Sequence, residues 1–165
     1  MSLFAVFDGH GGSEVSLLLK ESFCRELISL QEFKDKRYKQ ALKLCFRRMD
    51  EMLRRSEGRA RLRELTKEVW IKNENPAFSL MTMNGSENIG NFMGSTAVVV
   101  LITNENIFCA NSGDSRAVLG QLGGSSKLGM TTVTGIPKMC LPLSQDHKPT
   151  DFGERARIEA AGGFI

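Results

Sequence analysis

Long apolar runs are absent from this sequence, and their absence argues against a membrane-spanning helix. No hydrophobic stretch in the 165 residues approaches the roughly 20 that an α-helix needs to cross a bilayer. The first residues also lack the basic region and the longer apolar segment that a secretory signal peptide requires. We therefore expect no membrane insertion and a cytoplasmic or nuclear location.

Paired cysteines are absent as well. The four cysteines are widely spaced, form no C-x-x-C pair and lie among apolar neighbours: Cys24, Cys45, Cys109 and Cys140. Thiols in this pattern are typical of buried free cysteines in a reducing compartment rather than of zinc ligands or disulfides.

A strong charge imbalance is the third feature that is lacking. The formal net charge is only +3, because 22 basic residues are interleaved with 19 acidic ones, so the total gives no case for nucleic-acid binding. The composition, 41% hydrophobic and 25% charged, is ordinary for a globular protein, and the length suits one domain with a hydrophobic core.

The first half of the chain has mostly helical spacing. Residues 4–7 predict a short buried strand, and Ser13 is placed to cap a helix that runs to about Gln31. A polar break is expected at 32–37, followed by a second amphipathic helix from Tyr38 to Leu53. Its charged face is interpreted as solvated; the alternative is a docking surface for an acidic partner. The mixed pattern of 58–70 fits a further helix or an ordered excursion, and 73–92 is expected to be a loop.

The spacing changes to that of strands at Ser95. Residues 95–102 and 107–111 predict a hairpin around a turn at 103–106, and 116–119 predicts a third strand of the same antiparallel meander. A connecting loop over 120–135 is expected to lead to a short edge strand at 139–143, because Pro142 is poorly tolerated in a central strand.

A last helix is expected over 152–161. Asp151 and Glu154 resemble a capping box at its start, with Ile158 and Ala161 on its buried stripe. Gly162 is expected to end the helix in a left-handed conformation.

Two turns that carry acids are the strongest indication of chemistry. The first follows the strand at 4–7 and reads Asp8-Gly9-His10-Gly11-Gly12; the second reads Asn111-Ser112-Gly113-Asp114-Ser115-Arg116. A carboxylate at a strand end, with glycine beside it, leaves both the side chain and a backbone carbonyl open to a hard cation. His10 adds a group that exchanges a proton near neutral pH.

Each turn alone has a simpler interpretation. Asp8 and Gly9 also fit an ordinary turn in which His10 caps the next helix, and Asp114 fits a hairpin turn in which it pairs with Arg116. Read together, the two turns point to metal-assisted phosphate chemistry.

The sequence resembles the metal-dependent protein phosphatases of type 2C, the PPM family. Five segments in one order carry the resemblance: 4–12 with Asp8-Gly9-His10-Gly11-Gly12, 94–97 (Gly94-Ser95-Thr96-Ala97), 110–119 with Gly113-Asp114-Ser115-Arg116, 143–149 with Asp146-His147-Lys148-Pro149, and 154–163. The resemblance implies an α+β fold, part of an αββα layered β-sandwich flanked by helices. It implies a protein serine/threonine phosphatase that acts on phosphoprotein substrates.

The resemblance also implies residue roles. Two Mn²⁺ or Mg²⁺ ions, with a possible third, would be held in the family's site; Asp8 would bridge two of them and the Gly9 carbonyl would reach one. A metal-bridging hydroxide would attack phosphorus, and His10 would protonate the leaving oxygen. Asp114 matches a ligand of the third site. No catalytic role is implied for Arg116, for which we expect a structural ion pair.

The chain departs from the family pattern at both ends. Residues 1–165 are expected to form a partial type 2C domain, with variable stretches at about 57–92 and 120–138 and with N- and C-terminal strands missing. Some metal ligands would be missing with them, so this chain alone is expected to be inactive or impaired.

Three hypotheses follow. The first is a fragment of an active type 2C phosphatase, which we favour; the second is a non-catalytic, phosphatase-like binding or regulatory module. The third, outside the family, is a domain that binds nucleic acid or an acidic partner through the basic helices of 34–63, although interleaved acids dilute their charge.

Overall fold

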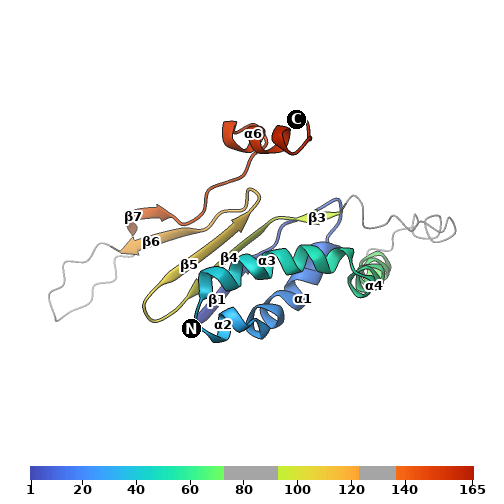
Figure 1. The fold of residues 1–165 in the computed structure, drawn as a ribbon, viewed down its shortest axis with the longest axis horizontal. Coiled ribbons are helices and arrows are strands. Elements are labelled where there is room, and N and C mark those ends of the chain that lie inside the picture. Colours follow the sequence, from blue (N-terminus) through green and yellow to red (C-terminus); the bar gives the residue numbers. More distant parts are fainter. Residues whose placement is uncertain (73–92, 123–136) are drawn as a thin grey trace.

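The computed structural model describes residues 1–72, 93–122 and 137–165, which form a small antiparallel sheet with helices on one side (Figure 1). The central sheet has the strand order β1-β4-β5. Its strands are β1 (Ser2–Val6), β4 (Ala97–Ile102) and β5 (Ile107–Ser112). Two short pairs accompany it: β2 (Gly9–His10) with β3 (Gly94–Ser95), and β6 (Val118–Leu122) with β7 (Pro137–Pro142).

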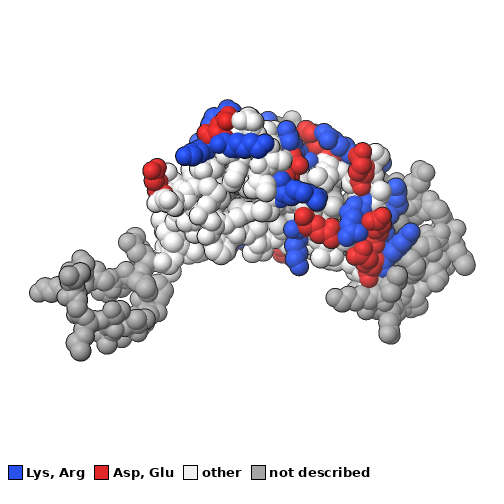
Figure 2. Space-filling model, turned by 90° about the horizontal axis from the view of Figure 1, so that it is seen from below, with Lys and Arg blue, Asp and Glu red and all other residues white. Residues whose placement is uncertain are grey.

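The helices follow the predicted order along the chain. They are α1 (Glu14–Ser29), α2 (Gln31–Lys34), α3 (Tyr38–Arg54), α4 (Ser56–Lys72) and α6 (Phe152–Ala160). None of the described helices is both long and apolar enough to span a membrane. Figure 2 shows basic and acidic side chains interspersed on one face of the molecule, beside a broad area without charge.

The core lies between the helices and one face of the central sheet. Strand residues point alternately to the two faces, so the aligned residues Leu3, Leu101 and Phe108 share the helix side. Leu101 is 2% exposed, and it belongs to one hydrophobic cluster with the apolar residues of α1 and α3. Phe7 contacts Phe23 of α1 with ring centroids 5.5 Å apart, which fixes the end of β1 against the helix layer.

The opposite face of the sheet is partly open within the described residues. Phe4 and Val6 of β1 lie on it and are 60% and 57% exposed. The strand predicted at 4–7 therefore forms over Ser2–Val6, but the prediction that it is buried was wrong, because the described residues cover only the helix side of this strand.

The predicted three-stranded meander is wrong in its last strand. β4 and β5 form the expected hairpin, with Thr103 N–H donating to the Asn106 carbonyl at 2.9 Å. β6 instead pairs with β7, and Leu119 lies opposite Leu141. This pairing extends beyond the two strands, because the Ala117 carbonyl accepts a hydrogen bond from Leu143 N–H at 2.9 Å. The chain therefore already lies beside the later segment before β6 begins.

Helix limits differ from the prediction at three places. The first helix ends at Ser29, because Leu30 adopts an extended ψ of 139°, and the expected polar break contains the short helix α2. Ser13 is the residue before α1 but its side chain makes no capping hydrogen bond. Residues 58–70 lie within α4, so of the helix and the ordered excursion the helix is confirmed. The predicted loop at 73–92 and most of the predicted loop at 120–135 lie outside the described residues.

The predicted capping box of the last helix does not form. Asp151 makes no side-chain cap, and its own backbone N–H donates to the Lys148 carbonyl at 2.9 Å. The Glu154 carboxylate binds Arg157 instead, with a shortest distance of 2.7 Å. Gly162 has the expected positive φ of 81°. The buried stripe is also absent: α6 has no buried residue and lies apart from the central sheet in Figure 1.

Candidate functional site

The first acidic turn is hydrogen-bonded to Thr96, which lies between β3 and β4 and 88 residues after Asp8. Asp8 follows the end of β1, and its backbone N–H donates to Thr96 Oγ1 at 3.2 Å. The Thr96 N–H donates in return to the Asp8 carbonyl at 2.9 Å. These two bonds hold the backbone of Asp8 while the residue remains exposed, so its carboxylate is open to a ligand.

His10 is positioned by a glycine on the neighbouring strand. In the β2–β3 pair, Gly9 lies opposite Ser95 and His10 opposite Gly94. A Cβ atom built on Gly94 would collide with the His10 imidazole, so the ring occupies the space that a side chain would fill. The imidazole therefore packs against Gly94, while His10 stays exposed and is two residues from Asp8 in the sequence.

Glu14, in the first turn of α1, is a buried acid that the sequence did not single out. It is 1% exposed, and its Oε2 atom lies over Gly12 without a hydrogen-bond donor among the described residues. The helix N-terminus favours a negative charge at this position. A single Glu after Ser13 looks like an ordinary first-turn acid, so no sequence signal distinguished it.

The second acidic turn contacts Thr96, the same residue that holds the first turn. Gly113 has φ of +100°, and a Cβ atom there would lie 2.8 Å from Thr96 Cγ2. The Thr96 hydroxyl also forms a 2.6 Å hydrogen bond with the Ser115 hydroxyl. Thr96, to which the sequence analysis assigned no role, therefore joins the Asp8 turn to the turn that carries Asp114, whose side chain is exposed.

A third segment supports the second turn from outside. The Asn111 side-chain amide donates to the Gln145 carbonyl at 2.7 Å, and the Gly113 carbonyl accepts from His147 N–H at 3.0 Å. Residues 145–147 thus anchor both ends of the turn that positions Asp114.

Arg116 pairs with Asp146, not with Asp114. Its guanidinium donates to both carboxylate oxygens at 3.0 and 2.8 Å, which is a bidentate pair. The hydrogen bond from Arg116 lowers the pKa of Asp146, and the same contact raises the pKa of Arg116. The geometry agrees with the expected structural ion pair, and it leaves the Asp114 carboxylate without this competitor.

The acids of the described residues make an incomplete metal site. Within 1–72, 93–122 and 137–165, no group of three or more His, Cys, Asp or Glu side chains is placed to hold one ion. Exposed carboxylates such as those of Asp8 and Asp114 suit Mn²⁺ or Mg²⁺, but a complete centre needs more oxygen ligands.

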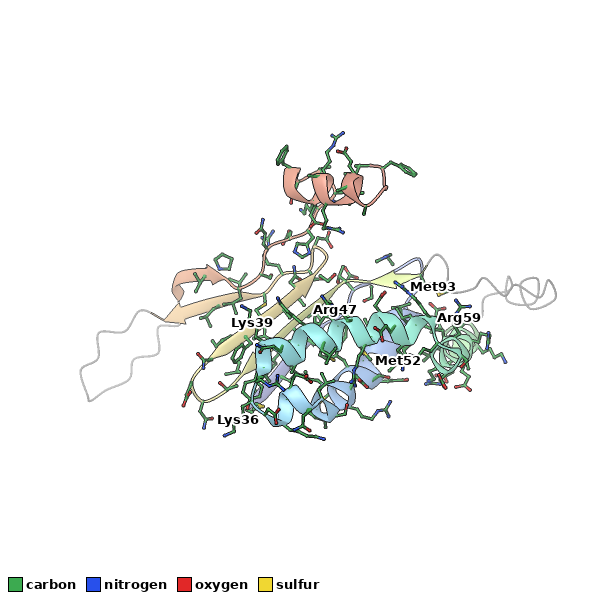
Figure 3. All side chains as sticks on the ribbon, viewed as in Figure 1. Lys36, Lys39, Arg47, Met52, Arg59 and Met93 are labelled. Carbon is green, nitrogen blue, oxygen red and sulfur yellow. The ribbon has the colours of Figure 1, made fainter. Side chains whose placement is uncertain are left out.

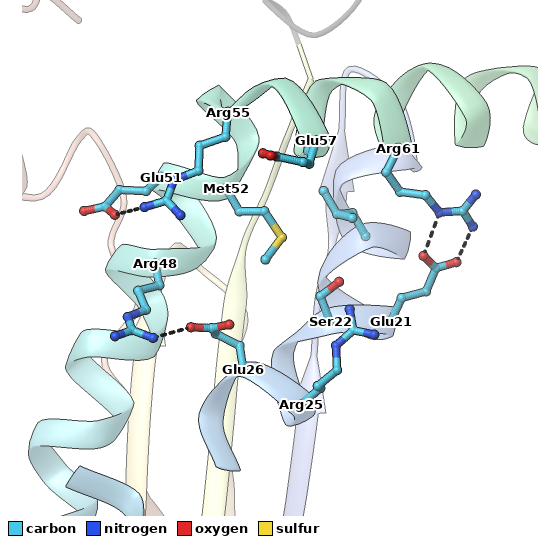
Figure 4. A pocket seen from close by; sticks show the side chains of 12 residues that line it. Glu21, Ser22, Arg25, Glu26, Arg48, Glu51, Met52, Arg55, Glu57 and Arg61 are labelled. Carbon is cyan, nitrogen blue, oxygen red and sulfur yellow. Dashed lines mark hydrogen bonds and ion pairs between the residues drawn. The ribbon is translucent and has the colours of Figure 1, made fainter. Parts of the chain in front are cut away.

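A charged cavity lies elsewhere, between α1, α3 and α4. It encloses about 900 Å³, and none of the candidate site residues lines it (Figure 4). Four arginines and four glutamates line it, and three pairs neutralise each other: Arg48 with Glu26, Arg55 with Glu51, and Arg61 with Glu21. The cavity therefore has no excess of carboxylates for a metal.

Comparisons with known proteins show which family this chain resembles. The family model described as protein phosphatase 2C matches residues 1–66 and 74–165. The chain is 33% identical over its whole length to "Probable protein phosphatase 2C 4" of Paramecium tetraurelia, of which it covers 44%. It is 35% identical, over 98% of its length, to "Probable protein phosphatase 2C 75" of Arabidopsis thaliana, of which it covers 34%.

A solved structure shows the same fold. The serine-threonine phosphatase 2C from Toxoplasma gondii matches 99% of this chain and 45% of its own chain, with a TM-score of 0.54 and 21% identity. The likeness confirms the predicted α+β, type 2C-like fold class. The chain spans less than half the length of the Paramecium relatives that it matches.

Proposed function

Because this chain belongs to the protein phosphatase 2C family, we propose that it supplies one half of the catalytic site of a metal-dependent protein serine/threonine phosphatase. The observation that carries the proposal is the contact of both acidic turns with Thr96, which brings Asp8 and Asp114 to the same end of the central sheet. Family membership implies metal dependence; the activity, the phosphoprotein substrates and the identity of the ions are our proposals.

Asp8 and the Gly9 carbonyl are proposed as ligands of a pair of Mn²⁺ or Mg²⁺ ions, and Asp114 as a ligand of a third. In the described residues these donors are too few, so we propose that further ligands come from other parts of the full-length protein. When bound, such ions lower the pKa of a coordinated water and neutralise charge on phosphoryl oxygens.

His10 is proposed as the general acid for the leaving oxygen of phosphoserine or phosphothreonine. Its ring packs against Gly94 and the residue is exposed to solvent, so it is available to a bound phosphate ester. An alkoxide is a poor leaving group, and a proton delivered from a positioned imidazole typically contributes about 10²- to 10⁴-fold in rate.

Phosphate release from phosphoserine and phosphothreonine peptides tests the activity. We expect the protein at its full native length to release phosphate only with Mn²⁺ or Mg²⁺, and the Asp8→Asn variant to lose this activity. Glu105→Gln is the matched control, because Glu105 is exposed in the β4–β5 turn and should leave the rate unchanged. A folded full-length protein that releases no phosphate would favour the non-catalytic binding module instead.

A series of phosphate esters with different leaving groups tests the role of His10. If His10 delivers the proton, His10→Ala should slow esters of poor leaving groups most and esters of acidic phenols least. A uniform slowing across the series would remove His10 as general acid while leaving the proposed metal ligands untouched.

A cytoplasmic or nuclear location is also proposed. All four cysteines are free in the structure, including Cys24 and Cys140, which are exposed and not buried as the sequence predicted. Free exposed thiols suit a reducing compartment. Imaging of a fluorescent fusion in its source cell tests the proposal, and a secreted fusion would contradict it.

A further inference from the structure

A basic groove lies between α3 and the outer edge of the central sheet. It encloses about 620 Å³, and its lining comes from α3 and from β5. Leu42, Phe46 and Phe108 contribute apolar surface, while Lys39, Lys43 and Arg47 are exposed along its helical rim. Figure 3 shows Lys39 and Arg47 on α3 at the side next to β5.

The charge of this groove is unbalanced, unlike the rest of α3. No acidic residue is among its lining residues, and Lys39, Lys43 and Arg47 form no ion pair with any acid of the described residues. Elsewhere on the same helix both other arginines have a partner: Arg48 with Glu26 and Arg54 with Asp50. The groove therefore presents three positive charges that an anionic partner can neutralise.

The wall of the groove opposite the helix is an unpaired strand edge. β5 is the last strand of the β1-β4-β5 sheet and pairs only with β4 among the described strands. In an antiparallel strand, alternate residues direct their backbone N–H and C=O groups away from the existing partner. An open edge of this kind accepts a further strand.

The spacing of the charges matches an extended chain. Lys39, Lys43 and Arg47 are four residues apart, so they rise by about 6 Å per step along the helix. Alternate residues of a β-strand are separated by about 6.6 to 6.8 Å. The start of α3 is fixed beside the start of β5 by the Tyr38–Phe108 ring contact, with centroids 5.6 Å apart.

We propose that this groove binds an acidic peptide segment in extended conformation, which adds to β5 as a further strand and directs alternate Asp or Glu side chains toward Lys39, Lys43 and Arg47. The backbone would supply hydrogen bonds to β5, and the charges would select the sequence. The intervening side chains would point to the opposite face of the sheet, away from α3.

The proposal goes beyond phosphatase activity and does not depend on it. Of the residues that line the groove, only Asn111 belongs to the turns that carry Asp8 and Asp114, and it is neither a proposed metal ligand nor the proposed general acid. A binding measurement therefore tests the groove without turnover, and its failure would not bear on the proposed catalytic site.

The experiment measures the fluorescence anisotropy of a labelled peptide in which Glu alternates with Val and Thr. We expect saturable binding that weakens roughly tenfold or more in Lys43→Glu, because an attraction is replaced by repulsion. Lys67→Glu on α4 is the matched control, since it makes the same charge change at an exposed lysine outside the groove, and it should bind within about twofold of the parent.

Two further probes separate strand addition from simple charge attraction. A peptide of the same sequence, N-methylated at alternate positions, cannot donate those backbone hydrogen bonds and should lose binding, and this test needs no variant protein. Equal binding of the N-methylated peptide, tighter binding of a single-stranded oligonucleotide or anionic vesicles, or unchanged binding by Lys43→Glu would each overturn the proposal.

Discussion

Gly113→Ala tests the contact that joins the two acidic turns. Two costs add at this position. A left-handed conformation costs a residue with a Cβ about 1–2 kcal/mol, and φ is +100° here. The new Cβ would also lie 2.8 Å from Thr96 Cγ2, well inside the roughly 3.5 to 4.0 Å of an ordinary carbon contact.

The overlap with Thr96 adds a second cost in unfolding free energy to the backbone strain. Overpacking of a well-filled site typically costs about 1–3 kcal/mol, so we expect Gly113→Ala to lose about 2–5 kcal/mol of unfolding free energy in total. This is a large part of the roughly 5–15 kcal/mol that keeps a domain folded. Urea unfolding followed by circular dichroism measures the loss as a shift in midpoint.

A second substitution tests the overlap between the new Cβ and Thr96. Thr96→Ser removes Cγ2 but keeps the hydroxyl that contacts Asp8 and Ser115. In the Gly113→Ala background it should recover less than about 1 kcal/mol, because Thr96 Cβ stays 2.9 Å from the new Cβ, and a double-mutant cycle would report this recovered part as coupling. A Gly113→Ala protein within about 0.5 kcal/mol of the parent, or a cycle without coupling, would refute the packing of the two turns on Thr96.

Three further predictions concern other parts of the structure. Arg116→Ala should raise the pKa of Asp146 toward its ordinary value of about 3.9, and the carboxyl ¹³C shift measures this pKa. Because folding lowers the pKa of Asp146, the ion pair stabilises the fold above the ordinary value. This stabilisation is lost as pH falls through the folded pKa. An Asp146 titration that Arg116→Ala leaves unchanged would contradict the ion pair. Burial raises the pKa of Cys45 to about 12, so a thiol reagent at mild pH should label exposed Cys24 and Cys140 and spare Cys45 until the protein unfolds; rapid labelling of native Cys45 is the contrary result. Leu101→Ala, at 2% exposure, should cost about 2–5 kcal/mol in urea unfolding, whereas Phe164→Ala, at 94% exposure, should cost under about 0.5, and similar costs for both would count against this core.

Local patterns predicted the elements that carry the candidate residues. The apolar run that ends in Asp8 and Gly9 indicated a strand from its own composition, although its partner β4 is distant in the sequence. The hairpin around the turn at 103–106 depends on contacts between near neighbours, so spacing and turn residues were sufficient. The amphipathic helix from Tyr38 was recovered for the same reason, because its buried face follows from its own periodicity.

Contacts between distant segments were beyond local patterns. The Thr96 bridge requires the β2–β3 register, which joins residues 85 or so positions apart, and nothing in either segment specifies that register. The same limit explains the wrong place of β6, whose partner β7 is separated from it by residues 123–136. Arg116 has an acid two residues away, yet it binds Asp146, thirty residues later.

The burial of Glu14 and the openness of α6 show a second limit. Whether an acid is enclosed, or an apolar stripe is covered, depends on which element packs against it. The sequence of each helix is compatible with both outcomes, so the prediction of a buried Ala161 was wrong although the helix itself was right.

Binding of Mn²⁺ is the measurement that tests the central claim most directly. Water-proton relaxation of the full-length protein, titrated with Mn²⁺, reports occupancy without any turnover. We expect Asp8→Asn to weaken the tightest binding by at least roughly tenfold, because it removes the carboxylate charge proposed to hold the ions, while Glu105→Gln binds as the parent does. Equal affinity of the parent and Asp8→Asn would contradict the account, because the Asp8 turn would then not be part of the metal site.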